Sequence, residues 1–243
     1  MNEFTGKATV YDKARPGYAP AALDYIAGLV KAPFACEGGT GGAVADIGAG
    51  TGKLSAMLCA RGYSVIAVEP DADMRSKLPI LPNLRVIEGI AEATGLPGQS
   101  VDAVTCAQAF HWFDGERFKQ ECVRILKPGG RIFVIYNIPP AGHTEANAEL
   151  EWQPHKYDPE RWKRNDEAML AFFGGAMRRE AFDNPVYYDR EHHEAYMLSH
   201  STSPRPGDGE CERFIASIAE IFERCNLNGK MLLPMETVVY TNA

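Results

Sequence analysis

The run VADIGAGTG, from Val44 to Gly52, constrains the fold more than any other part of this 243-residue chain. An apolar stretch, Ala43–Ile47, leads into the glycines, and a helical stretch, Gly52–Ala60, follows them. Glycines let the chain turn tightly and let a ligand approach the backbone, and the start of a helix presents free N–H groups. The run therefore predicts a ligand site at a junction of strand, loop and helix.

Apolar runs and helical stretches alternate along much of the chain. This alternation predicts an α/β fold with a doubly wound, mostly parallel seven-stranded sheet and helices on both faces. The predicted strands are Ala43–Ile47, Ser64–Val68, Leu84–Ile87, Val101–Thr105, Arg131–Tyr136, Pro185–Tyr188 and Thr237–Tyr240. The predicted helices begin after Pro20 and cover Gly52–Ala60, Ala72–Lys77, Gly115–Leu126 and Glu212–Cys225.

The predicted organisation is a single domain over residues 1–243, with residues 1–35 as an amino-terminal helical cover. Residues 138–182 carry prolines and mixed charge with only short helical stretches. They predict an insertion or lid over the carboxyl edge of the sheet that shapes the substrate site. Its aromatic side chains either line the substrate chamber or anchor the insertion to the sheet: Trp152, Trp162, Phe172 and Phe173.

The composition bounds the partners of the protein. The formal net charge is −7, which disfavours duplex nucleic acid, because such binding depends on Lys and Arg neutralising phosphates. We find no apolar run long enough for a membrane span and no signal-peptide core. The six cysteines form no CxxC pair and are expected to be reduced and mostly buried. We expect a cytoplasmic monomer or homodimer that binds no nucleic acid and no membrane.

The histidines do not predict a metal site. His192 and His193 adjoin in a predicted strand, so their side chains would point to opposite faces. His143 and His155 lack a set of Cys or carboxylate residues at metal-ligand spacing. We therefore expect surface histidines and no metal.

The spacing of the glycines distinguishes between nucleotide ligands. A dinucleotide fingerprint, GxGxxG/A, would place a small residue where this chain has Lys53. Asp46, just ahead of the glycines, suits an amino-bearing ligand better than a pyrophosphate. Glu69 ends the second apolar run, where a carboxylate can accept hydrogen bonds from both hydroxyls of a ribose. These residues favour a nucleoside that carries an amino group over a dinucleotide.

DIGAGTG followed by VEP resembles motif I and the acidic strand end of class I S-adenosylmethionine-dependent methyltransferases. The runs YDKARPGY, GIAEATGLP, VDAVTCAQAFHWFD and LKPGGRIFVIYN resemble the small-molecule type 11 branch, which includes relatives of trans-aconitate methyltransferase. The resemblance covers residues 8–137 well, is thin across 138–182 and is moderate from 183 onward. It implies S-adenosylmethionine as cofactor, S-adenosylhomocysteine as product and a small-molecule methyl acceptor.

The resemblance also implies roles for single residues. Asp46 would hold the methionine amino group, Glu69 the ribose hydroxyls and Gln108 the methionyl end. Ile90 stands where many relatives carry an Asp that reaches the adenine amino group, so Glu92 or a backbone carbonyl would replace that contact. The remaining implied cofactor contacts are Tyr11, Arg15, Gly48, Ala49, Gly50, Gly52, Pro70, Met74 and Ala91.

Phe110, His111 and Trp112 follow the fourth predicted strand, at the sheet edge where ligands bind in such folds. They are the predicted substrate pocket. His111 would be a general base or, alternatively, would orient a loop or cap a helix. Trp112 is expected to be a pocket wall rather than a chemical group.

The leading hypothesis is methyl transfer from S-adenosylmethionine to a carboxylate or hydroxyl of a small molecule. A carboxylate acceptor requires no base, whereas a hydroxyl benefits from one. One alternative is a non-catalytic S-adenosylmethionine-binding module. Another is a nicotinamide-dependent oxidoreductase, which Lys53 disfavours.

Overall fold

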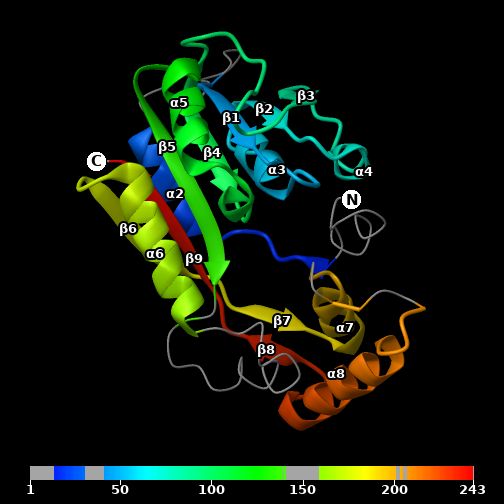
Figure 1. Cartoon of the computed structure of the whole chain (residues 1–243). Helices are drawn as coiled ribbons and strands as arrows, with labels where there is room; N and C mark the ends of the chain where they lie inside the picture. The colour runs from blue at the N-terminus through cyan, green and yellow to red at the C-terminus, as the bar shows by residue number, and fades with distance from the viewer. Residues whose placement is uncertain are drawn as a thin grey trace.

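The computed structural model describes residues 14–30, 41–138, 140, 159–200, 203–204 and 207–242, with only the backbone of 159–165. Its centre is a seven-stranded sheet in the order β3-β2-β1-β4-β5-β9-β6 (Figure 1). β9 is antiparallel to both of its neighbours, and the other strands are parallel to one another. The predicted doubly wound sheet is confirmed. The strands are β1 Ala43–Ile47, β2 Ser64–Val68, β3 Leu84–Ile87, β4 Val101–Ala107, β5 Leu126–Ile138, β6 Met177–Asp183 and β9 Glu236–Asn242.

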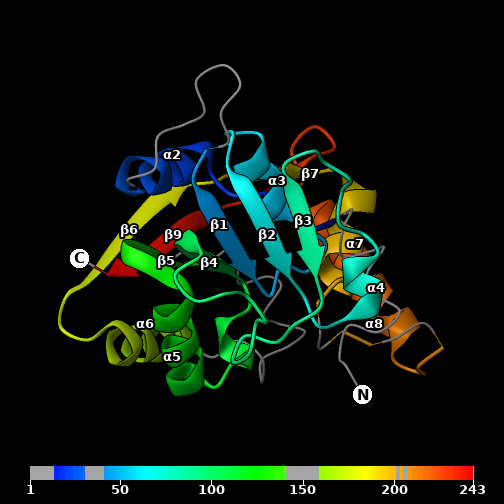
Figure 2. The same cartoon turned by 90° about the horizontal axis from the view of Figure 1, so that it is seen from above.

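Helices cover both faces of the sheet (Figure 2). α2 (Pro20–Leu29) and α3 (Lys53–Cys59) bury apolar side chains in the core of one face. α5 (Gly115–Ile125) and α6 (Pro159–Phe173) do so on the other face. Pro20 suits the first turn of α2, where its missing N–H is not needed. The centre of the sheet is therefore buried on both sides, as the apolar runs of its central strands require, whereas the edge strand β6 is largely exposed.

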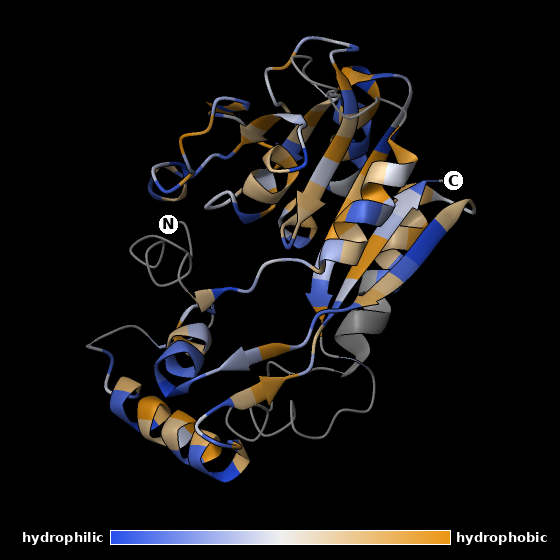
Figure 3. Ribbon diagram, turned by 180° about the vertical axis from the view of Figure 1, so that it is seen from behind, coloured by the Kyte–Doolittle hydropathy of each residue, from blue (hydrophilic) through white to orange (hydrophobic). Residues whose placement is uncertain are grey.

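A small separate unit lies beyond the carboxyl ends of the parallel strands (Figure 1). We call residues 186–233 the cap. Its core is lined by α8, whose predicted apolar stripe contributes Phe214, Ile218 and Phe222 (Figure 3). The stripe is thus confirmed as core. The cap elements are β7 Val186–Tyr188, α7 Arg190–Leu198, α8 Cys211–Cys225 and β8 Met231–Leu233, and β7 pairs antiparallel with β8.

His192 and His193 lie in helix α7, so the prediction that places them in a strand is wrong. The Asp189 carboxylate accepts a hydrogen bond from the His192 backbone N–H and caps the helix. His193, Tyr196 and Met197 are buried at helical spacing. His193 is fully buried against Phe222 rather than on the surface.

The structure divides the predicted insertion, residues 138–182, differently. Of its described residues, Ile138 ends β5, and the stretch 159–182 contains α6 and most of the edge strand β6. The Phe172 ring lies 4.9 Å from that of Phe110 and 5.7 Å from that of Phe118, so Phe172 anchors α6 to α5 and to the turn after β4. Among the described residues, the elements beyond the carboxyl edge belong to the cap, and the lid remains a prediction for the rest of the insertion. Trp152 and the side chain of Trp162 lie outside the described residues.

Three observations concern the composition. Among the described helices, none is both long and apolar enough to cross a membrane. Of the described cysteines, Cys59, Cys106, Cys122 and Cys211 are buried, Cys225 is half-buried and all are free thiols. Within the described ranges, no group of three or more His, Cys, Asp or Glu side chains is arranged to hold a metal ion.

Candidate functional site

A cavity of about 270 Å³ lies at the carboxyl ends of β1, β2, β4 and β5. The chain leaves β1 for β2 on one side and returns to β4 on the other, so the cavity sits where the strand order reverses. Ligands bind at such a point in open α/β sheets. The lining residues are Arg15, Pro16, Tyr18, Asp46, Gly48, Ala49, Gly50, Thr51, Lys53, Leu54, Glu69, Pro70, Asp71, Met74, Ala107, Gln108, Ala109, Trp112, Phe113, Asn137, Tyr196 and Met235.

Three glycines shape the loop between β1 and α3. Gly48, Gly50 and Gly52 have φ of +67°, +57° and +86°, a region that favours glycine. A Cβ on Gly48 would lie 2.8 Å from the Ala109 Cβ, and one on Gly52 would lie 2.9 Å from a methyl of Leu78. A Cβ on Gly50 would meet nothing within 4 Å. Gly48 and Gly52 are thus needed for packing, whereas Gly50 leaves open space where a ligand can touch the backbone.

Glu69 follows β2, and its carboxylate connects the glycine loop to the turn after β2. Its Oε2 accepts a hydrogen bond of 2.8 Å from the Gly50 N–H, and its Oε1 accepts one of 2.9 Å from the Asp71 N–H. The side chain is 7% exposed, and burial raises its pKa above the usual value. Each carboxylate oxygen has a second lone pair, so the group can still accept two hydrogen bonds from a ligand.

Asp46 lies deeper, near the end of β1. Its Oδ2 accepts a hydrogen bond of 2.6 Å from the Ser55 hydroxyl, and its Oδ1 accepts one of 2.9 Å from the Thr105 hydroxyl. Burial raises the pKa of this carboxyl to about 6, and the hydroxyls only partly oppose that shift. A cationic ligand group beside Asp46 would favour its ionised form.

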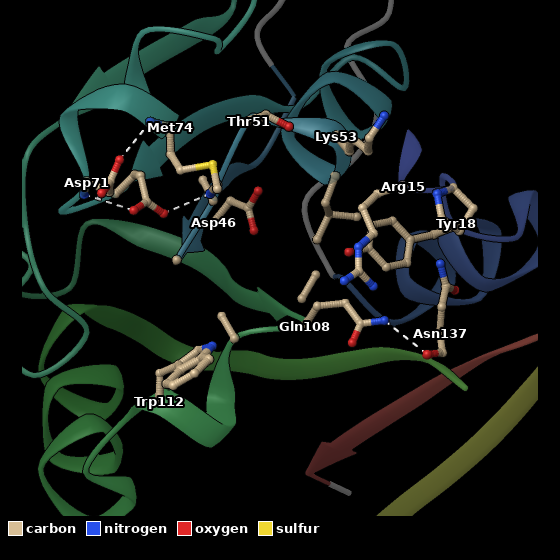
Figure 4. A pocket seen from close by; sticks show the side chains of 18 of the residues that line it. Arg15, Tyr18, Asp46, Thr51, Lys53, Asp71, Met74, Gln108, Trp112 and Asn137 are labelled. Carbon is tan, nitrogen blue, oxygen red and sulfur yellow. Dashed lines mark hydrogen bonds between the residues drawn. The ribbon is translucent and has the colours of Figure 1, made fainter. Parts of the chain in front are cut away.

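The amino-terminal segment and the ends of β4 and β5 form the opposite side of the cavity. Figure 4 shows Arg15, Tyr18, Gln108 and Asn137 gathered at one end, with Asp71 and Met74 at the other and Asp46 between them. The Gln108 side-chain amide donates a 3.0 Å hydrogen bond to the Asn137 carbonyl. The cavity therefore has a carboxylate-rich end and an end with amide and guanidinium groups.

The structure brings most of the predicted site residues to this cavity. Arg15, Asp46, Gly48, Ala49, Gly50, Glu69, Pro70, Met74, Gln108 and Trp112 line it. Gly52, Ala91, Glu92, Phe110 and His111 do not, and Tyr11 lies outside the described residues.

Four of those exceptions have a local cause. Ala91 is 5% exposed and Phe110 is 8% exposed, and both pack in the core beneath the cavity. The Glu92 carboxylate accepts a hydrogen bond from the Asp114 N–H, 2.8 Å away. The 3₁₀ turn Phe110–Trp112 leaves the His111 side chain exposed, with its ring against those of Trp112 and Tyr136.

Several lining residues were not predicted from the sequence. Lys53 was noted only as a departure from the dinucleotide pattern, yet it lines the cavity. Asn137 follows the predicted fifth strand, Arg131–Tyr136, and lies one residue before the end of β5, so its place at the carboxyl edge was a usable signal. Tyr196 and Met235 come from the cap and the strand connection after it, and no local pattern in the sequence marks them.

Comparisons with known proteins show that part of the chain is similar to methyltransferases. A family model described as a methyltransferase domain matches residues 45–134. An uncharacterized methyltransferase of Mycobacterium tuberculosis is 40% identical over 135 residues, which are 55% of this chain and 51% of that protein. The malonyl-[acyl-carrier protein] O-methyltransferase of Methylococcus capsulatus is 35% identical over 94 residues, covering 36% of this chain and 34% of that protein.

Solved structures share the whole fold. A putative type II methyltransferase from Anaeromyxobacter dehalogenans superposes with a TM-score of 0.68 at 22% identity, covering 94% of this chain and 95% of that one. A putative methyltransferase from an antibiotic biosynthesis pathway of Anabaena variabilis gives 0.65 at 21% identity, covering 95% and 99%. The chain spans about half the length of the mycobacterial relative that it matches. Its residues 45–134 match a methyltransferase domain, within a fold that solved methyltransferase structures share.

Proposed function

We propose that the protein transfers a methyl group from S-adenosylmethionine to an oxygen atom, carboxylate or hydroxyl, of a small molecule. The observation that carries this proposal is the pair formed by Glu69 and Gly50: a buried carboxylate held by a loop N–H, beside open space over that loop. S-adenosylmethionine, when bound, supplies an activated sulfonium methyl group. The protein has then to orient the acceptor and exclude water.

The lining residues fit the parts of this cofactor. The free lone pairs of Glu69 would accept hydrogen bonds from the ribose hydroxyls. Asp46 would face the amino group, and the open backbone at Gly50 would lie against the ribose and methionyl portion. Pro70 and Met74 would pack on the adenine, since Met is soft and suits an aromatic face. These assignments rest on the match between the groups that line the cavity and the parts of the cofactor that they would contact.

The rest of the cavity would take the acceptor. Trp112, Phe113, Tyr196 and Met235 give it apolar and aromatic walls, and Asn137 adds an amide. Such a site suits a small organic molecule held by a few polar contacts. The name of the Methylococcus relative, an O-methyltransferase, supports oxygen as the accepting atom. Kinship with trans-aconitate methyltransferase in particular stays a prediction.

Calorimetry with S-adenosylmethionine and S-adenosylhomocysteine tests the cofactor, and methyl transfer to a panel of carboxylic acids, phenols and alcohols tests the reaction. We expect binding of both cofactor forms and turnover with an oxygen acceptor. Binding without any turnover across the panel would instead indicate a non-catalytic binding module. Binding of NAD without S-adenosylmethionine would indicate an oxidoreductase.

Affinity for S-adenosylmethionine is expected to rise as the pH increases from about 5 to about 7. The Asp46 carboxyl, with a pKa of about 6, is mostly protonated at the lower pH and ionised at the higher one. The cationic ligand favours the ionised form. Calorimetry across this range measures how the affinity changes with pH. The variant Asp46→Asn should bind more weakly near neutral pH, and its affinity should no longer depend on pH in this range. An unchanged slope in the variant would contradict the assignment.

The same carboxyl has the opposite effect on the ligand-free protein. A raised pKa in the folded state means that the folded protein binds the proton more tightly than the unfolded chain. The contribution to the free energy of unfolding is therefore present below about pH 4 and is lost as the pH rises through about 6. Asp46→Asn should flatten this dependence, as chemical denaturation at several pH values would show.

Replacing His111 with Asn is expected to leave S-adenosylhomocysteine affinity within about 2-fold of the wild type, because the exposed ring does not line the cavity. Its effect on turnover then separates two kinds of acceptor. If His111 serves as a base for a hydroxyl, kcat falls by about 100-fold or more. With a carboxylate acceptor, kcat stays near the wild-type value. Steady-state kinetics with the best acceptor decides between them.

A further inference from the structure

The amino-terminal residues 14–19, which we call the bridging segment, connect the cap to the sheet. Ala14 is 1% exposed and packs in the core of the cap with Phe214 and Met231. Next to it, Arg15, Pro16 and Tyr18 line the cavity. The segment therefore runs from the cap core directly along the wall of the cofactor site.

The cap holds the first end of this segment through Tyr188. Its hydroxyl donates a buried hydrogen bond of 2.7 Å to the Ala14 carbonyl. The Tyr188 ring is fixed in turn between His192, at 6.2 Å, and Tyr196, at 5.4 Å between centroids. Buried hydrogen bonds of this kind are costly to break, because the carbonyl is left without a donor.

Tyr196 acts on the next residue along the segment. The guanidinium carbon of Arg15 lies 5.3 Å from the centroid of the Tyr196 ring, within cation–π distance. Both side chains line the cavity. The ring of Tyr196 thus supports the guanidinium from the side of the cap.

The sheet holds the second end of the segment. The Gly17 carbonyl accepts hydrogen bonds from the side-chain amides of Asn137, at 3.0 Å, and Asn184, at 2.9 Å. The Ala19 N–H donates to the Thr237 hydroxyl, 2.9 Å away. Arg15 therefore sits between an anchor in the cap and an anchor at the ends of β5 and β9.

We infer that Tyr188 and Tyr196 are positioning residues for the cofactor site, because together they hold Arg15 against it from the cap. The inference rests on the proposed function and on Arg15, which lines the cavity, being the cofactor contact that the resemblance implies. It makes cofactor affinity depend on the packing of the cap, although Tyr188 itself does not line the cavity.

The test compares two neighbouring tyrosines. Tyr188→Phe removes the donor to Ala14 and keeps the ring, while Tyr187→Phe makes the same chemical change at a side chain that is 61% exposed. We expect Tyr188→Phe to weaken S-adenosylhomocysteine binding by about 3- to 10-fold and Tyr187→Phe to leave it unchanged. In the ligand-free protein, amide hydrogen exchange at residues 14–19 should be faster in Tyr188→Phe alone.

Two further comparisons separate positioning from general loss of structure. Tyr196→Leu should weaken binding by a similar factor, and Tyr196→Phe, which keeps the ring face, should retain it. In an Arg15→Ala background, Tyr188→Phe should cause no further loss, since the group that it positions is gone. An undiminished loss in that background would overturn the inference, as would identical behaviour of Tyr188→Phe and Tyr187→Phe. A wild-type protein that binds no S-adenosylhomocysteine would defeat the proposed function instead, and the exchange comparison would still decide whether Tyr188 holds the segment.

Discussion

Glu69→Ala is expected to weaken S-adenosylhomocysteine binding by about 1–3 kcal/mol, which corresponds to about 5- to 150-fold. The carboxylate would accept hydrogen bonds from both ribose hydroxyls, and it also accepts hydrogen bonds from the N–H groups of Gly50 and Asp71. Its removal therefore leaves both the ligand and the loop without their acceptor. Calorimetry measures the loss, and thermal unfolding shows how much of it reflects the fold.

The control for this variant is Glu180→Ala, which removes an equal charge from an exposed position on the edge strand β6. It should bind the product like the wild type. Glu69→Gln keeps one acceptor oxygen and should fall between the two. Wild-type affinity in Glu69→Ala, with a folded protein, would refute the role of this residue.

Gly50→Leu is expected to reduce S-adenosylhomocysteine binding by roughly 100-fold, because the new side chain would enter the space that the ligand needs. A leucine at a φ of +57° also costs about 1–2 kcal/mol of stability. That cost has to be separated from the effect on binding.

Gly174→Leu is the matched control for Gly50→Leu. Gly174 has a φ of +75°, and its Cβ would likewise meet nothing within 4 Å, but it lies after α6 and away from the cavity. Both variants should lose a similar free energy of unfolding in urea, and only Gly50→Leu should lose binding. Equal affinity in the two variants would show that the space over Gly50 is not used by the cofactor.

The carboxylate-rich half of the cavity was predictable because its residues are close in sequence. Asp46, Gly50, Glu69 and Met74 fall within two successive strand–loop–helix units. Buried parallel strands read as short apolar runs, and polar residues at their carboxyl ends converge on one edge. In such a unit, residues that are close in the sequence are also close in the folded structure, so the local pattern is enough to predict where they lie.

The other half depends on contacts between distant segments. Arg15, Asn137, Tyr196 and Met235 meet only because the chain returns from the cap to the sheet. For α7 a usable signal existed: the Asp189 cap and the buried positions of the helix precede and follow the paired histidines. The adjacent histidines alone do not distinguish a strand from a helix, and the strand predicted for them is wrong.

The edge strand β6 shows a limit of a different kind. Its sequence, MRREAFD, is largely exposed and lacks the alternation of a half-buried strand. An edge strand pairs through its backbone on one side only, so few of its side chains need to be apolar. Because no side-chain pattern marks this strand, most of it falls within the predicted insertion, residues 138–182, and not among the predicted strands.

The connection between β6 and β9 has a consequence for how such a protein can diversify. Asp183 and Glu236 are paired in the sheet, and Val186 and Leu233 are paired just beyond it, so the two ends of the cap leave the sheet side by side. The entire cap therefore takes the place of the loop that joins two antiparallel strands, β6 and β9, in a hairpin. Lengthening such a loop raises the free energy of loop closure by only about 0.6 kcal/mol for each doubling of its length. Because Tyr196 lies within the cap and lines the cavity, exchange of the cap between relatives would change the acceptor wall and leave the glycine loop in place.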